Sequence, residues 1–366
     1  MFSGARLRQA RELRRLTQSD LARLVARSQG TIANLEAGLL IPSQEMRSEI
    51  ASCTGFPVSF FSSDIQLEFP TESLMLRARA AVTRRDLISA CRFAEIVYEV
   101  VTRVLERYSE PIPVTIQTNA QSPILAAQQA RRLADLPPDQ PIPHVTHSIE
   151  KTGILVLSLP IEIQKIDAFS LWIGAEPKRP VIAMCANKSG DRLRWNLSHE
   201  RGHLALHGGV KQLRAQEHRE ADQFAAEYLL PEIAMRAEMR PPITLSSLAP
   251  LKIRWGVSLQ ALVTRAFDLS IISQWQKQRL FEQISSKGWK TREPANLDIP
   301  IEKPRSLRKM AEIAYGRPID FTRLAAESQL TVEAVKQIVA GYDEGTTLPT
   351  FEKSSKGKVL HLMRSE

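Results

Sequence analysis

The pattern of hydrophobic and polar positions predicts a mainly helical chain with a few short strands. Apolar residues recur every three or four positions, which is the helical period, along most of the 366 residues. Short apolar runs bounded by glycine, proline or polar residues predict strands over 153–157, 169–173 and 181–184. We therefore expect an α+β fold that is mainly α, with a small sheet among the helices.

Residues 4–38 predict three short helices, the second and third beginning after Thr17 and Ser28. Both residues are of the type that caps a helix, because a hydroxyl accepts from exposed backbone N–H groups. The apolar positions of the three helices are Leu7, Ala10 and Leu13, then Leu21, Leu24 and Val25, then Ile32 and Leu35. Two helices joined by a short turn, the second with small polar residues on its outer face, are typical of a DNA-reading helix-turn-helix.

The stretch LTQSDLARLVARSQGTIANLEAG, residues 16–38, resembles the XRE family of lambda-repressor-like domains. The resemblance implies that Gln18 contacts a phosphate and that the third helix faces base edges in the major groove. The residues expected at DNA are Gln18, Ser28, Gln29, Gly30, Thr31 and Asn34. Gly30 stands where a base-reading side chain could be, which predicts modest specificity. Such proteins usually read two half-sites and so form a homodimer. The alternative is a protein-binding module that no longer binds DNA.

Proline-rich breaks divide the chain further. We expect four regions: a helix-turn-helix domain at 1–62, a helical linker at 63–113, a larger α+β region at 114–294 and a helical C-terminal region at 295–366. The linker is expected to hold one helix over 73–108 that acts as a spacer or dimer-forming element. Residues 320–339 have a helix-turn-helix rhythm, which we interpret as part of a small appendage and not as a second DNA reader.

The residues most suited to metal binding or catalysis lie at 195–209, WNLSHERGHLALHGG, which hold three of the 7 histidines of the chain. His199 and His203 are four apart, so a helix places both imidazoles on one face, close enough to share a metal ion. Glu200 follows the first histidine, where its carboxylate can act as general base for an attacking water. This is the HExxH pattern of zinc peptidases. Gly202 leaves room for another element to approach the helix. The alternative is a solvated helix that happens to carry two histidines.

A catalytic zinc needs a third protein ligand. The next helix is predicted over 217–231, with a buried stripe of Ala221, Phe224, Ala225 and Tyr228. Extending this stripe back by one turn reaches His218 and Glu217, while Glu220 lies nearer the flank. Imidazole and carboxylate both bind zinc, so the spacing leaves these alternatives open, along with a solvent-exposed His218. We expect Tyr228 in the core, and His207 either behind the ligands or at the helix end.

The stretches RLRWNLSHERGHLALH and EHREADQFAAEYLLP together resemble the ImmA/IrrE family of metallopeptidases over residues 115–294. The resemblance implies that His199 and His203 bind Zn2+, or another divalent cation, and that Glu200 is the base. The glutamate that the family uses as third ligand falls on His218, which we take as the ligand, with Glu217 next. Arg201 stands where the family usually has an apolar residue, and it either faces solvent or tunes the cleft.

The overall composition narrows the class of protein. The formal net charge is +9 and the pI is near 9.6, which is compatible with a polyanionic partner. Seven arginines stand before residue 40, against three acidic residues. No apolar run is long enough for a membrane span, and no secretory signal is evident. The three cysteines are far apart and suggest neither disulfides nor a thiolate zinc site. We expect a cytoplasmic protein.

Two functions of different class follow from these patterns. The first is a zinc endopeptidase joined to a DNA-binding domain, which cleaves a repressor or antitoxin that itself carries a helix-turn-helix and so derepresses genes. The second is a transcription regulator without catalysis, in which the metal site senses or stabilises. An antitoxin shares this architecture and is a third possibility. Glu200 distinguishes them, because only the peptidase needs it.

Overall fold

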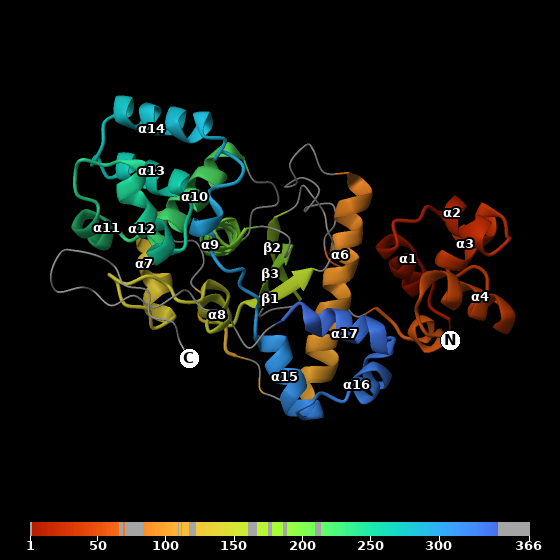
Figure 1. The fold of residues 1–366 in the computed structure, drawn as a ribbon. Coiled ribbons are helices and arrows are strands. Elements are labelled where there is room, and N and C mark those ends of the chain that lie inside the picture. Colours follow the sequence, from red (N-terminus) through yellow and green to blue (C-terminus); the bar gives the residue numbers. More distant parts are fainter. Residues whose placement is uncertain are drawn as a thin grey trace.

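A computed structural model gives the arrangement of the chain (Figure 1). It describes residues 2–65, 69, 83–108, 110, 112–116, 122–159, 167–174, 178–185, 189–208 and 214–342. Among these residues a single three-stranded sheet lies between groups of helices, which confirms the α+β, mainly α fold class. None of the helices in the described part of the chain is long and apolar enough to cross a bilayer.

Four helices and a short 3-10 turn form the N-terminal domain. They are α1 (Gly4–Leu13), α2 (Gln18–Leu24), α3 (Gln29–Glu36), α4 (Gln44–Thr54) and η1 (Val58–Ser62). The predicted caps form as expected, because the Thr17 and Ser28 hydroxyls accept from the backbone of α2 and α3. Leu24 differs from the prediction, since its side chain is 55% exposed whereas Leu21 and Val25 are buried.

A long helix, α6 (Arg84–Glu99), connects this domain to the rest of the chain. It continues through a π turn, η2 (Val100–Val104), and a 3-10 turn, η3 (Leu105–Arg107). The predicted helix over 73–108 is therefore observed from residue 84, and residues 73–82 lie outside the described residues. Every residue from Ser89 to Val97 is buried by other parts of the same chain. This surface of the helix is occupied by packing within the chain, and the role of spacer or dimer-forming element stays a prediction.

The body of the molecule combines the sheet with eight helices. They are α7 (Pro123–Leu133), α8 (Val145–Glu150), α9 (Gly190–Leu206), α10 (Ala215–Leu229), α11 (Glu232–Glu238), α12 (Leu245–Trp255), α13 (Leu259–Asp268) and α14 (Gln274–Ser286), followed by the 3-10 turn η4 (Ala295–Leu297). The start of α9 is fixed by a buried ion pair, because the Lys252 amine of α12 lies 2.5 Å from the Asp191 carboxylate. The same amine contacts Glu293 at 2.9 Å.

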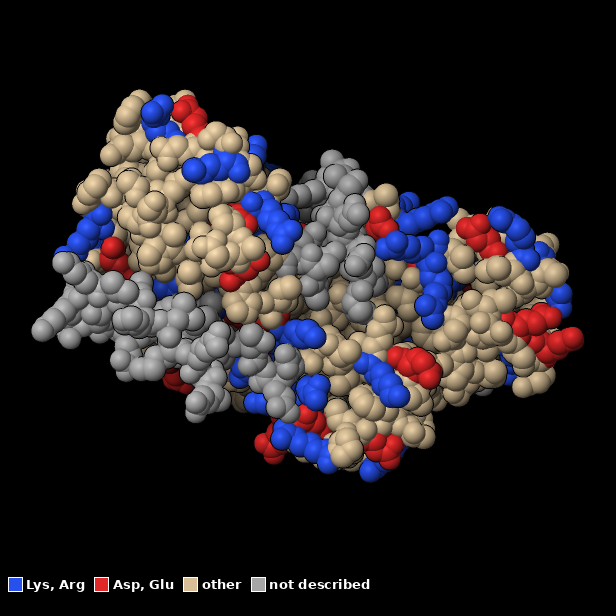
Figure 2. Space-filling model, viewed as in Figure 1, with Lys and Arg blue, Asp and Glu red and all other residues tan. Residues whose placement is uncertain are grey.

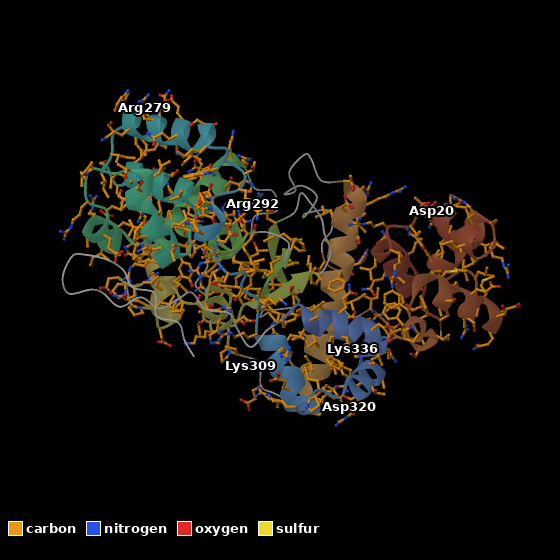
Figure 3. The ribbon with its side chains drawn as sticks, in the orientation of Figure 1. Asp20, Arg279, Arg292, Lys309, Asp320 and Lys336 are labelled. Carbon is orange, nitrogen blue, oxygen red and sulfur yellow. The ribbon has the colours of Figure 1, made fainter. Side chains whose placement is uncertain are left out.

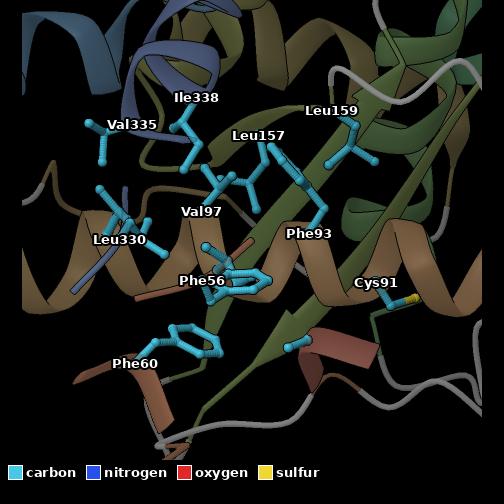
Figure 4. Close-up of a cluster of buried hydrophobic side chains, with 14 of the residues drawn as sticks. Phe56, Phe60, Cys91, Phe93, Val97, Leu157, Leu159, Leu330, Val335 and Ile338 are labelled. Carbon is cyan, nitrogen blue, oxygen red and sulfur yellow. The ribbon is translucent and has the colours of Figure 1, made fainter. Parts of the chain in front are cut away.

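The sheet separates two hydrophobic cores. Its strands are β1 (Leu155–Leu159), β2 (Ala168–Ile173) and β3 (Arg179–Cys185), in the order β1-β3-β2, with β1 parallel and β2 antiparallel to β3. Because successive strand residues point to opposite faces, Leu155, Leu157 and Leu159 join one core while Val156 joins the other. The first core runs from the N-terminal domain through α6 to the C-terminal helices (Figure 4). The second lies under α7–α14.

The C-terminal region holds three helices, α15 (Ser306–Tyr315), α16 (Phe321–Ser328) and α17 (Val332–Ala340). Helices α16 and α17 repeat the local geometry of α2 and α3 at a constant offset along the chain. Thr331 caps α17 as Ser28 caps α3, and Gln329 takes a left-handed φ of 55° where Ala26 has 49°. The helix-turn-helix pattern predicted over residues 320–339 is therefore present in the structure as two helices and a turn. The predicted tail beyond residue 342 lies outside the described residues.

A buried polar network joins α1 to α6. Glu95 is fully buried and accepts from Arg92 Nη1 at 2.7 Å, Gln9 Nε2 at 3.1 Å and the Phe69 N–H at 2.8 Å. Arg92 also donates to Glu12 of α1 at 2.7 Å. A buried ion pair that loses one partner leaves an uncompensated charge, which is more costly than the pair itself is stabilising.

We therefore expect Glu95→Ala to lower the free energy of unfolding by about 3–5 kcal/mol, measured by denaturant unfolding. Glu45→Ala, on the exposed side of α4, is the matched control and should change it by less than about 0.5 kcal/mol. Equal unfolding midpoints for the two variants would show that the network does not hold α1 on α6.

Candidate metal centre and nucleic-acid interface

The candidate metal centre lies where α9 and α10 cross. Gly202 of α9 faces Phe224 of α10, and a Cβ placed on Gly202 would lie 3.1 Å from the Phe224 side chain. The two helices approach closely because glycine has no side chain to separate α9 from Phe224 at this point. This confirms that Gly202 makes room for a neighbouring element. The close approach brings the start of α10 beside His199 and His203.

Three imidazole nitrogens converge at the crossing. His199 Nε2 and His203 Nε2 are 3.0 Å apart, and His218 Nδ1 lies 3.3 Å from His203 Nε2 and 3.4 Å from His199 Nε2. Tetrahedral zinc with Zn–N bonds of about 2.0–2.1 Å requires ligand nitrogens roughly 3.3 Å apart. The spacing of the three nitrogens therefore fits one zinc ion, and these residues form a group that could hold a metal.

In His199 and His203, the ring nitrogen that points away from the cluster is linked to a carboxylate. The link is direct for His199 and runs through the His207 ring for His203. Asp222 Oδ1 lies 2.8 Å from His199 Nδ1. A carboxylate only accepts, so His199 carries its proton on Nδ1 and points the Nε2 lone pair at the other rings. His203 Nδ1 lies 3.1 Å from His207 Nδ1, and His207 Nε2 lies 2.8 Å from Glu220 Oε2. Such outer contacts orient metal ligands and fix their tautomers.

The carboxylate of Glu200 lies beside the sheet. Its Oε2 accepts from the Ser170 hydroxyl of β2 at 2.6 Å, and its side chain is partly exposed. Ser170 lies on the face of β2 that turns toward α9, because its neighbours Phe169 and Leu171 point into the opposite core. The sheet therefore holds the predicted general base in place.

The structure separates the alternatives for the third ligand. Glu217 folds back onto the start of its own helix, where its Oε2 accepts from the Arg214 N–H at 2.8 Å. Glu220 is bonded to His207, and this hydrogen bond lowers the pKa of the Glu220 carboxyl. The expectation that Glu217 points inward was wrong, because capping the helix satisfies its carboxylate locally. His218 is the one brought to the two HExxH histidines.

The structure also bears on three further predictions about this region, for Arg201, Tyr228 and His207. Arg201 neither faces solvent nor lines the cleft, since it is buried and donates to Thr152 Oγ1 at 2.8 Å, with its guanidinium over the Tyr228 ring. Burial lowers the pKa of Arg201. Tyr228 is fully buried, as expected of a core residue, and its hydroxyl is 2.9 Å from Ser148 Oγ. His207 is both the C-cap of α9 and a contact of His203.

Comparisons with known families agree with this geometry. Residues 149–267 match a peptidase family model described as the IrrE N-terminal-like domain, and residues 4–58 match a helix-turn-helix domain. This chain carries an IrrE-like domain behind a helix-turn-helix domain. No curated protein matches its sequence closely enough to add to this. The matched range of the IrrE-like domain contains β1 to β3, α9 and α10, and so all three converging histidines.

The helix-turn-helix domain presents α3 at the surface. Ser28, Gln29, Gly30 and Asn34 are exposed and Thr31 is half-buried. Some of these polar groups also bond within the domain. Gln29 Nε2 donates to Gln18 Oε1 at 2.7 Å, and Ser28 Oγ lies 2.9 Å from Thr31 Oγ1. The side chain of Gln18, in turn, donates to Glu36 Oε2 at 2.9 Å. The predicted DNA residues are thus all at least partly exposed, and Gln18 links α2 to α3.

Most arginines of this domain pair with carboxylates of the same chain. The pairs are Arg6 with Glu99, Arg8 with Glu12, Arg11 with Glu36, Arg15 with Asp86, Arg23 with Asp20 and Arg27 with Glu49. In Figure 2 the basic and acidic side chains accordingly lie interspersed on this domain. The basic N-terminal sequence therefore does not translate into a uniformly positive surface. Arg23 keeps the largest exposure of the six, at 79%.

We expect the purified chain to bind one zinc ion, and His203→Ala to lose it because only two of the converging nitrogens remain. Zinc content per chain, measured by plasma mass spectrometry after dialysis against metal-free buffer, checks this. His147→Ala is the control, since His147 of α8 lies outside the converging group and its loss should leave the content unchanged. Equal zinc in wild type and His203→Ala would contradict the site.

Proposed function

We propose that this chain is a zinc-dependent endopeptidase joined to a DNA-binding domain, and that it cleaves a helix-turn-helix repressor or antitoxin to derepress genes. The observation that carries the proposal is the convergence of His199, His203 and His218 with mutual nitrogen distances of 3.0–3.4 Å. Glu200 follows His199 directly, as the HExxH pattern requires. The family match to a peptidase domain over the same residues supports it.

Zinc held by the three imidazoles would act as a Lewis acid, lowering the pKa of a water and polarising the scissile carbonyl. Glu200 would accept the proton of the attacking water and return it to the leaving amine. Ser170 donates to one oxygen of that carboxylate, which restricts its rotation. Asp222 holds the ring of His199 in the orientation that binding needs.

The sheet offers a means to hold an extended peptide. β2 is an outer strand in the order β1-β3-β2, and it packs against α9. An extended substrate could add to its outer edge by main-chain hydrogen bonds, as peptides do at exposed sheet edges. Because Ser170 of this strand touches Glu200, a peptide bound there would pass close to the general base. This geometry favours a protein substrate with an accessible extended segment.

The DNA-binding half of the proposal rests on the exposed polar face of α3. Gln29 and Asn34 carry amides of the kind that pair with adenine in the major groove. The match of residues 4–58 to a helix-turn-helix domain supports this assignment. The internal pairing of most arginines favours few phosphate contacts, and a twofold pair of chains would supply two half-sites.

Glu200→Gln should abolish proteolysis while leaving zinc content intact, because an amide cannot accept the proton of the attacking water. New protein N-termini in a cell extract incubated with the purified chain, identified by mass spectrometry, measure the activity. Glu217→Gln is the matched control, since Glu217 caps α10 and lies away from the nitrogens. Cleavage that persists in Glu200→Gln would favour the regulator or antitoxin without catalysis.

Arg23→Ala should reduce the slope of log affinity against log salt for duplex DNA by about one, because one phosphate contact is lost. Fluorescence anisotropy with labelled duplex DNA at several salt concentrations gives the slope. Arg279→Ala is the control, because Arg279 of α14 is 60% exposed but lies at the other end of the molecule from Asp20, the partner of Arg23 (Figure 3). A salt slope near zero in the wild type would indicate a protein partner for this domain.

A further inference from the structure

We propose that His207 and Glu220 form a relay that positions His203 for metal binding, so that the centre depends on a residue pair outside its ligands. The inference rests on the proposed zinc site and adds to it a role for side chains that touch no metal. Its basis is a continuous row of contacts from His203 through His207 to Glu220, each within hydrogen-bonding distance.

The row crosses from one helix to the other. His203 belongs to α9, His207 is the residue that ends α9, and Glu220 belongs to α10. His203 Nδ1 and His207 Nδ1 are 3.1 Å apart, and His207 Nε2 and Glu220 Oε2 are 2.8 Å apart. The side chain of His207 is only 6% exposed, whereas that of Glu220 is 32% exposed. The second oxygen of Glu220 accepts from Gln216 Nε2 at 2.7 Å, which fixes the carboxylate.

The proton positions along the row follow from the last acceptor. The Glu220 carboxylate accepts, so His207 Nε2 carries a proton, and in the neutral imidazole His207 Nδ1 then has a lone pair. His203 Nδ1 must then donate to His207 Nδ1, which leaves the lone pair of His203 on Nε2. That is the nitrogen that lies 3.0 Å from His199 Nε2 and 3.3 Å from His218 Nδ1. The relay thus selects the tautomer of His203 that can bind a cation.

The carboxylate also has an electrostatic effect. A negative group behind a ligand imidazole raises the basicity of that ligand. Asp222 does this for His199 directly, whereas Glu220 acts on His203 through one intervening ring. Glu220 itself is not a ligand candidate in this arrangement, since both its oxygens are engaged by His207 and Gln216. The two carboxylates of α10 therefore serve the two HExxH histidines by different routes.

The relay predicts that His207→Phe binds zinc about 10–100-fold more weakly than the wild type. Competition with a chromophoric chelator on the full chain gives the dissociation constant. Glu220→Gln should cause a smaller loss, because its amide oxygen can still accept from His207. Gln223→Ala, at an exposed position of α10, is the control and should bind as the wild type does. At saturating Co2+, the absorption spectrum of His207→Phe should remain tetrahedral, because all three ligands are kept.

A double-mutant cycle separates a relay from independent effects. His207→Phe with Glu220→Gln should bind as weakly as His207→Phe alone, because Glu220 acts only through His207. His207→Phe with Asp222→Asn should show the product of the two single losses, because Asp222 serves a different ligand. Zinc affinity of His207→Phe within twofold of the wild type would overturn the relay. A wild-type chain that binds no zinc would instead overturn the proposed function.

Discussion

The close approach of α9 and α10 at Gly202 is the constraint on which the candidate metal centre depends. A Cβ at position 202 would lie 3.1 Å from the Phe224 side chain, so any larger residue there would require Phe224 to shift. His218 is one turn before Ala221, at the start of the stripe that packs on α9. The contact that closes the core therefore also carries the third imidazole to the other two. Packing and ligand geometry are fixed by the same crossing.

The sheet relates this centre to the helix-turn-helix domain. One face of its strands belongs to the core shared by the N-terminal domain, α6 and the C-terminal helices, while the other face belongs to the core under α9. Strand alternation thus turns Ser170 toward Glu200 and its neighbours toward α6. Because α1 is joined to α6 by the buried network around Glu95, the helix-turn-helix domain is packed onto this assembly and not merely tethered to it.

Local patterns in the sequence were enough to predict the elements and much of the site. Capping residues, helical spacing and the HExxH pattern depend on neighbours a few positions apart, so Thr17, His199 and His203 could be placed without a structure. Asp222 was missed although it follows His218 by four residues, the spacing that signals a shared helix face. Ser170 and the partners of the arginines could not be found, because they come from distant segments. The buried position of Arg201 was unpredictable for the same reason: Thr152 and Tyr228 surround it.

The two helix-turn-helix units show why turn geometry alone does not assign DNA binding. Leu324 and Val335 are buried in α16 and α17 as Leu21 and Ile32 are in α2 and α3. The same pattern of buried positions therefore forms both helix pairs. The outer faces differ. Glu333 occupies the first turn of α17, where a carboxylate would repel phosphates, and it lines a cavity of about 480 Å³ against Arg14 of the N-terminal domain. The face of α17 that corresponds to a reading surface lines this pocket, where Glu333 and Gln337 stay exposed. The residue types on the outer face, and not the turn, distinguish α3 from α17: Glu333 stands where α3 has Gly30.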